Sequence, residues 1–318
     1  MSLATLRRYP GNLFLVSTAF VMLSLASYYV LRILLSESFE LLLSSESVFV
    51  IAGLTIALLV GSQGPLDFVI MVPVAILAFA EELFVNGTLV WLGFLLAFFG
   101  LVSLPAIAIF FRKESSDVSD VLEVTALMFA TRLVLVPFPV DFLQSSTAIP
   151  IIYALILCAL VAYIWIRRLP LAEVGLTLGK GHLPTQVALG LACGAVLGVI
   201  ELNILHPPAI AFGPSLLVNV AYILITMLAF VALTEELLYR GLIQVRLAKI
   251  MPKWQAVHIC AFLFALFSIG WFNPLELIFA YAAGVVFGYL MFRYDSLIGP
   301  IMAHGFGNVV LYLLTLGV

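Results

Sequence analysis

Charged side chains are scarce in this sequence. Its 318 residues include 14 Lys and Arg and 17 Asp and Glu, together 10% of the chain, whereas 64% of residues are hydrophobic. A soluble domain carries about 25% charged residues, and so large an apolar excess cannot be hidden inside a water-soluble fold of this length. The net charge of −3 also lacks the basic surface that nucleic-acid binding requires. These shortages exclude a soluble enzyme, a disordered chain and a nucleic-acid-binding module, and they predict an integral membrane protein.

Cysteine is also rare. Cys158, Cys193 and Cys260 each lie within an apolar run, and no two of them form a CxxC pair. An odd number without paired spacing excludes a disulfide framework and a cysteine-based zinc site. We interpret the three residues as small buried hydrophobes.

The sequence contains many long runs of apolar residues. A transmembrane helix needs about 20 mainly apolar residues, and runs of this kind between polar, Pro or Gly breaks predict an all-α polytopic membrane helix bundle of about 11 transmembrane helices. The expected spans are 12–34, 48–62, 66–83, 88–111, 120–138, 148–166, 186–205, 215–236, 255–272, 276–292 and 298–316.

The positions of the basic residues predict how these spans are oriented. Basic residues concentrate on the cytoplasmic side of membrane proteins. If the N-terminus is cytoplasmic and the spans alternate, the C-terminus lies outside, and all of the 14 Lys and Arg residues except Arg32 and Arg132 fall on the inner side. The expected localisation is therefore the cell membrane, as a multi-pass protein.

The longest polar connection, RRLPLAEVGLTLGKGH at 167–182, is interpreted as a cytoplasmic linker. We divide the chain into an N-terminal transmembrane module of unknown role, residues 1–147, and a C-terminal module, residues 148–318, which holds the motifs described below.

Glycines recur at helical spacing in two of the expected spans. Gly190, Gly194 and Gly198 are four residues apart, and Gly284 and Gly288 form a GxxxG pair. Small residues on one stripe of a membrane helix let two backbones approach closely. We expect both stripes to be packing faces.

The densest group of charges in an apolar setting is TEELLYRG at 234–241. Glu236 and Arg240 are four residues apart and can pair on one helical face, whereas Glu235 points about 100° away and is left without that partner. Charges inside a membrane are costly and tend to be functional, and a carboxylate at an apolar edge suits a general base. The alternative is that both acids merely lie at the membrane interface.

A second motif, HGFGN at 304–308, places His304 and Asn308 on one face of the last span. If that span begins near Gly299, His304 lies about 8 Å deep at 1.5 Å per residue. Glu235 lies at a similar distance from Arg240, so we expect the two motifs to meet near the cytoplasmic surface. The alternative for a single histidine is a structural role.

These motifs resemble those of the CAAX-processing and bacteriocin-processing (CPBP) intramembrane proteases, which include the type II CAAX prenyl endopeptidases. The family pattern is EExxxR, FxxxH and HxxxN on successive membrane helices. EELLYR (235–240) matches the first motif and HGFGN (304–308) the third, whereas FALFS (264–268) has Ser268 where the family has a histidine. The resemblance covers about 148–318 and does not extend to the N-terminal module.

The resemblance implies an intramembrane endopeptidase that hydrolyses a peptide bond near the cytoplasmic face. Glu235 would be the general base for an attacking water, and His304 and Asn308 would stabilise the oxyanion or orient the water. Glu236 and Arg240 would support Glu235. The expected partners are a protein or peptide substrate, lipidated or not, and the lipid bilayer, with no nucleic acid.

Ser268 stands where the family has the histidine of FxxxH, and this difference bears on whether the protein can be catalytic. A hydroxyl can hydrogen-bond the water but cannot take up a proton near neutral pH as an imidazole can. His258, in WQAVH (254–258), is the other imidazole that could substitute, unless it is a structural interfacial residue. A catalytic zinc takes three protein ligands, and Glu235, His304 and one uncertain residue do not make such a set. We therefore expect that no cofactor is required, and zinc is the weaker form of this hypothesis.

Two further interpretations stay open. A catalytically impaired relative could bind or scaffold protein or lipid partners through the same residues, and the missing histidine favours this. A transporter is also compatible with the many spans and with Arg132 and Glu123 in one predicted helix.

Overall fold

The computed structural model describes residues 90–135, 148–207, 215–271 and 273–316, and individual positions between 73 and 83. Every element assigned in these ranges is helical, which confirms the all-α part of the predicted fold class. The expected spans at 12–34 and 48–62 lie outside the described residues. The chain divides into two compact units, one formed by 1–133 and 246–277 and the other by 134–245 and 278–318. The predicted module boundary at 147/148 stays a prediction.

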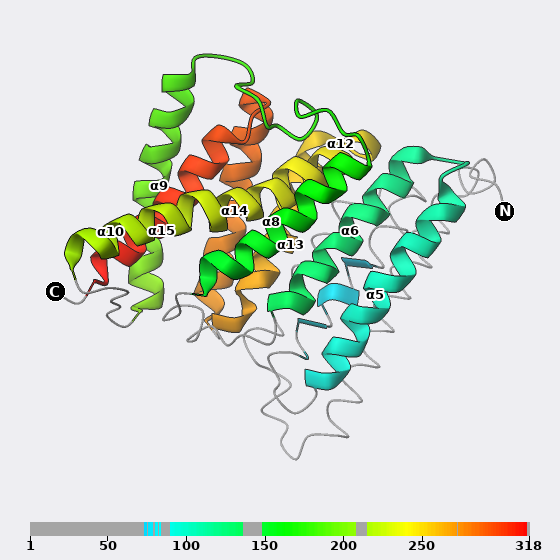
Figure 1. The fold of residues 1–318 in the computed structure, drawn as a ribbon, viewed down its shortest axis with the longest axis horizontal. Coiled ribbons are helices and arrows are strands. Elements are labelled where there is room, and N and C mark those ends of the chain that lie inside the picture. Colours follow the sequence, from blue (N-terminus) through cyan, green and yellow to red (C-terminus); the bar gives the residue numbers. More distant parts are fainter. Residues whose placement is uncertain are drawn as a thin grey trace. The chain divides into compact units, whose positions relative to one another are not determined.

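The first unit contains α5 (Val90–Phe111), α6 (Ser116–Leu135), α13 (Lys253–Leu266) and the 3₁₀-helix η4 (Phe267–Trp271). Helices α5 and α6 approach closely at Gly100, where an added Cβ would lie 2.5 Å from the Phe129 ring. They run side by side in Figure 1.

The intramembrane charges of this unit have partners that differ from those the sequence suggested. Arg132 pairs with the fully buried Glu81 at 2.6 Å and lies 5.3 Å from the centre of the Phe267 ring. Glu123, on the same helix as Arg132, instead pairs with Arg112. The two charges that favoured a transporter thus belong to separate ion pairs.

The second unit contains the helices that form the candidate site. Helices α8 (Ile149–Ile166) and α9 (Leu183–Leu205) come first, and α15 (Ile298–Leu314) comes last. Most of α14 (Pro274–Tyr294) also belongs to this unit. Between them in the sequence lie α10 (Leu216–Ile225), the π-helix η2 (Thr226–Ala232), α11 (Leu233–Glu236) and the π-helix η3 (Leu237–Gln244). Helix α12 (Val245–Ile250) follows η3, and all of it except Val245 belongs to the first unit.

Helices α9 and α15 pack backbone to backbone, and they lie side by side in Figure 1. A Cβ added at Gly190, Gly194 or Gly198 would lie 2.8, 2.5 or 2.4 Å from a carbonyl oxygen of α15. This confirms the first predicted glycine stripe as a packing face. The contact fixes the helix that carries His304.

One helix is longer than predicted. The expected span 215–236 ends at the Glu-Glu pair, but the helical run continues from Leu216 to Ile250. The predicted end was wrong because polar residues such as Arg240, Gln244 and Arg246 usually lie at the membrane surface and so indicate the end of a span. All three are instead completely buried within the protein, so they do not end the helix.

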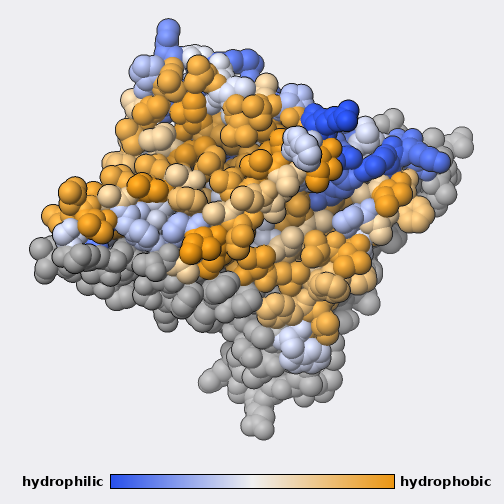
Figure 2. Space-filling model, in the orientation of Figure 1, coloured by the Kyte–Doolittle hydropathy of each residue, from blue (hydrophilic) through white to orange (hydrophobic). Residues whose placement is uncertain are grey.

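The surface is that of a multi-pass membrane protein. Among the described residues, five helices are long and apolar enough to cross a membrane: 91–111, 149–166, 183–205, 216–250 and 275–294. Helices α13 and α15 are apolar but shorter, and α6 carries four charged residues, so the number of eleven spans stays a prediction. Figure 2 shows hydrophobic side chains over α5 and α8, where Phe99 and Leu155 are 59% and 65% exposed.

Cys158 is exposed on this apolar surface, so its predicted burial was wrong; Cys260 is buried as predicted.

The polar connection at 167–182 packs against the turn between α14 and α15. The amide of Leu297 donates to the carbonyl of Gly175 at 2.9 Å, and the Ser296 hydroxyl donates to the carbonyl of Thr177 at 2.7 Å. Lys180 pairs with Asp295 at 2.5 Å. This connection therefore helps to fix the start of α15, six residues before His304.

We predict that Gly194→Ala destabilises the second unit, because the new methyl group would press on the Ala303 carbonyl of α15. Overpacking of this kind costs about 1–3 kcal/mol. Thermal unfolding in detergent micelles would measure the loss. The matched control is Ala192→Val, which adds volume on the exposed face of the same helix. Equal midpoints for the two variants would contradict the assigned packing face.

Candidate functional site

The Glu-Glu pair lies in a short α-helical segment between two π-helical ones. Helix α11 ends at Glu236, with η2 before it and η3 after it. π-Helical turns are rare and often occur at functional sites, because they change the direction in which successive side chains point. Glu235 and Glu236 therefore lie in one α-helical turn with a π-helical segment on each side.

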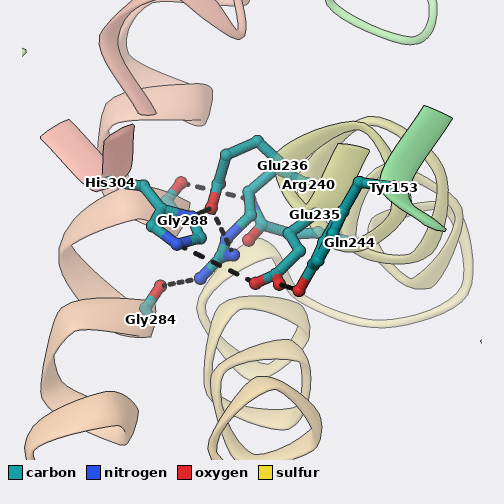
Figure 3. Close-up of polar contacts among 8 residues, drawn as sticks. All are labelled: Tyr153, Glu235, Glu236, Arg240, Gln244, Gly284, Gly288 and His304. Carbon is teal, nitrogen blue, oxygen red and sulfur yellow. Dashed lines mark hydrogen bonds and ion pairs between the residues drawn. The ribbon is translucent and has the colours of Figure 1, made fainter. Parts of the chain in front are cut away.

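Glu236 is the centre of a buried polar network (Figure 3). It has no exposed surface, and its carboxylate accepts a hydrogen bond from Arg240 at 2.9 Å, which confirms the predicted pair. The Arg240 guanidinium also donates to the carbonyl of Gly284 at 3.2 Å, and Gln244 donates to that of Gly288 at 3.1 Å. The second glycine pair thus supplies backbone acceptors on α14 to the helix that carries the acids.

His304 connects α15 to both acids of α11. Its Nδ1 lies 2.7 Å from Oε1 of Glu236, and its Nε2 lies 3.8 Å from Oε2 of Glu235. Because a carboxylate accepts hydrogen bonds, we assign the proton on Nδ1 as the one donated to Glu236. The ring stacks on Phe287 of α14 with centroids 5.3 Å apart, which fixes its plane. Nε2 is thereby held toward Glu235.

Glu235 is the more accessible of the two acids, with 19% of its side chain exposed. Its Oε1 accepts a hydrogen bond from the Tyr153 hydroxyl of α8 at 2.6 Å. The adjacent Thr234 hydroxyl donates to the backbone carbonyl of Tyr153 at 3.4 Å. The expectation that Glu235 lacks a partner was wrong, because a neutral phenol from another helix reaches it. Its Oε2 faces His304 at a distance too long for a direct hydrogen bond.

The other predicted site residues are placed as follows. Asn308 lies one helical turn beyond His304 on α15 and is partly exposed, and no hydrogen bond joins its side chain to another described residue. His258 in α13 and Ser268 in η4 are both half-buried and belong to the first unit. The predicted contributions of these two residues beside Glu235 stay predictions.

Sequence reasoning missed two side chains near the acids. Tyr153 could not be identified from the apolar sequence IPIIYALILC, because a single tyrosine in a membrane helix does not indicate a functional site. Glu201, half-buried on α9, interacts electrostatically with both His304 and Glu235. That residue could have been found, because an acidic residue within an expected span is itself an indication of function.

The described part of the chain has no group of three or more His, Cys, Asp and Glu side chains placed to hold a metal ion. Glu235, Glu236 and His304 are gathered, but Glu236 is bonded to Arg240 and His304, and Glu235 is bonded to Tyr153. Whether the protein requires zinc stays a prediction.

With this geometry in place, the chain can be compared with known proteins. Residues 217–310 match the family model described as type II CAAX prenyl endopeptidase Rce1-like. The matched segment includes EELLYR and HGFGN, so the resemblance seen in the sequence is confirmed over this segment. No curated protein and no solved structure matches the chain.

We predict that Glu236→Gln strongly destabilises the protein, because Arg240 would keep its charge in a fully buried position without the carboxylate. Removing one partner of a buried ion pair costs about 3–5 kcal/mol. Thermal unfolding in micelles measures the change. The double variant Glu236→Gln/Arg240→Met, which removes both charges, should recover much of the loss. A single variant as stable as wild type would show that the pair is not the centre of the network.

Proposed function

We propose that this protein is an intramembrane endopeptidase of the CPBP type, with Glu235 as general base. The observation that carries the proposal is the placement of Glu235 Oε2 at 3.8 Å from Nε2 of His304, within a segment that matches the type II CAAX prenyl endopeptidases. A water molecule between these two atoms could hydrogen-bond to both. An acid and an imidazole that face each other at this spacing are suited to activating a nucleophile.

In the proposed reaction, Glu235 Oε2 takes a proton from the water as the water oxygen bonds to the peptide carbonyl carbon. His304 and Asn308 stabilise the oxyanion that forms or orient the water. Glu235 then returns the proton to the leaving amine as the C–N bond breaks. Water is consumed, two peptide fragments are released and Glu235 is restored.

Other residues have supporting roles in this proposal. Glu236 and Arg240 hold His304 and the α11 backbone in place through the buried ion pair. Ser268 would hydrogen-bond the water, and His258 is the imidazole that could take the role of the missing family histidine. Neither role is required by the geometry of Glu235 and His304.

The proposed substrate is a protein or peptide, lipidated or not, that reaches the site from the bilayer. We place the site near the cytoplasmic face, with the N-terminus cytoplasmic and the C-terminus outside, because this arrangement leaves the basic residues on the inner side. A prenylated C-terminal peptide is the first substrate to test, since it is named in the description of the matched family.

The non-catalytic alternative has one specific observation in its favour, which is Ser268 at the histidine position of FxxxH. In that case Glu235 and His304 would serve in binding or packing only. The assay below separates the two functions.

We predict that Glu235→Gln lowers the cleavage rate by about 10²–10⁴-fold, the usual contribution of general-base catalysis. The assay uses proteoliposomes and internally quenched peptides, farnesylated, geranylgeranylated and unmodified. Glu173→Gln, in the connection outside the site, is the matched control. Cleavage by the wild type that persists unchanged in Glu235→Gln would exclude Glu235 as the base, and no cleavage by the wild type would favour the binding protein.

We further predict that chelators leave the activity of purified protein unchanged, because the proposed reaction needs only Glu235, His304 and water. Dialysis against EDTA or 1,10-phenanthroline, followed by the same peptide assay and metal analysis, tests this. A zinc content near one atom per chain that disappears in Glu235→Gln would overturn the metal-free mechanism.

A further inference from the structure

Tyr153 is the polar group that links α8 to the proposed base. Helix α8 has the sequence IPIIYALILCALVAYIWI, and Tyr153 is half-buried on it. Its hydroxyl donates to Oε1 of Glu235 at 2.6 Å, and its backbone carbonyl accepts from Thr234 at 3.4 Å. Two neighbouring residues of α11 are thus bonded to one residue of α8, which fixes the register of the two helices at this point.

The consequence lies in how the two oxygens of Glu235 are divided. The phenol occupies Oε1 from the α8 side, while Oε2 faces Nε2 of His304 on α15 at 3.8 Å (Figure 3). A glutamate side chain without such a bond can change rotamer, so that neither oxygen stays directed at His304. A short hydrogen bond from a phenol to a carboxylate is strong enough to hold one arrangement.

We propose that Tyr153 is a positioning residue, which holds one oxygen of the Glu235 carboxylate so that the other stays directed at His304 and at the attacking water. This inference rests on the proposed function. The hydrogen bonds of Glu236 hold Arg240 and His304, whereas the hydrogen bond from Tyr153 acts on the Glu235 side chain directly. Without the phenol, the base would still be present but no longer held in one orientation. Misplacement of a reacting group by about 1 Å can cost 10²-fold in rate.

The first test is Tyr153→Phe, which removes the hydroxyl and keeps the ring. We expect kcat to fall about 10- to 100-fold while KM stays within about twofold, because orientation of the base affects the chemical step and not substrate binding. The matched control is Tyr163→Phe on the same helix, since Tyr163 lies about 15 Å farther along the helix at 1.5 Å per residue. It should behave as wild type.

A second measurement separates positioning from a structural role. Fluorinated tyrosines at position 153 make the phenol a stronger donor with almost no change in size. We expect 3-fluorotyrosine and 3,5-difluorotyrosine to lower kcat stepwise, by about twofold each, as stronger donation makes the carboxylate a weaker base, with KM and the unfolding midpoint constant. This series does not depend on whether Tyr153→Phe folds.

The outcomes distinguish the two proposals. One outcome is that the wild type cleaves the peptide and Glu235→Gln does not, while Tyr153→Phe and the fluorotyrosine proteins have the kcat of the wild type. This outcome would overturn the positioning role of Tyr153 and leave the proposed function intact. If the wild type cleaves no peptide, both fall together. A parallel loss of kcat and of unfolding midpoint in every Tyr153 protein would assign the hydroxyl a structural role and overturn the proposal.

Discussion

The buried ion pair between Glu236 and Arg240 is the interaction on which the rest of the site depends. Neither side chain is exposed. Charges in such a position are tolerated only when their hydrogen bonds are satisfied, because desolvation costs several kcal/mol for each ion. Glu236 uses its carboxylate for Arg240 and His304, and Arg240 reaches a backbone carbonyl of α14. Three helical segments are therefore tied together by one charge pair, and the direction of the His304 ring follows from it.

Glycine is what allows this network to exist between apolar helices. At Gly190, Gly194 and Gly198 the absence of a side chain lets α9 approach the α15 backbone, and it is α15 that carries His304. At Gly284 and Gly288 the carbonyls of α14 accept from Arg240 and Gln244. The same residue type thus has two uses: close packing between helices in one stripe and buried backbone acceptors in the other.

The features that the sequence predicted correctly are those set by local spacing. The Glu236–Arg240 pair follows from a separation of four residues on one helix, and the meeting of His304 with the acids follows from matched depths in two spans. Contacts made by residues outside these motifs could not be predicted in this way. Tyr153 lies 82 residues from Glu235, and Arg132 bonds with Glu81 on a different segment rather than with its helical neighbour Glu123. The helix end after Glu236 was misplaced for a related reason, since spacing does not reveal that the following polar residues are buried.

The geometry also bears on whether the site is catalytic or only structural. A structural polar network gains most when every donor and acceptor is in direct contact, because an incomplete bond in a low-dielectric interior is unfavourable. Glu236 meets this condition at Oε1, which contacts Arg240 at 2.9 Å and His304 at 2.7 Å, but its buried Oε2 has no hydrogen-bond partner among the described residues. Glu235 differs in that its Oε2 lies 3.8 Å from the imidazole while its side chain keeps some exposure. Direct contact would serve packing better, whereas a gap between a carboxylate and an imidazole leaves access for a third group that bonds to both. Hydrolysis and ligand binding both need such access and a packing role does not, so the spacing around Glu235 argues against packing alone and is consistent with the proposed reaction.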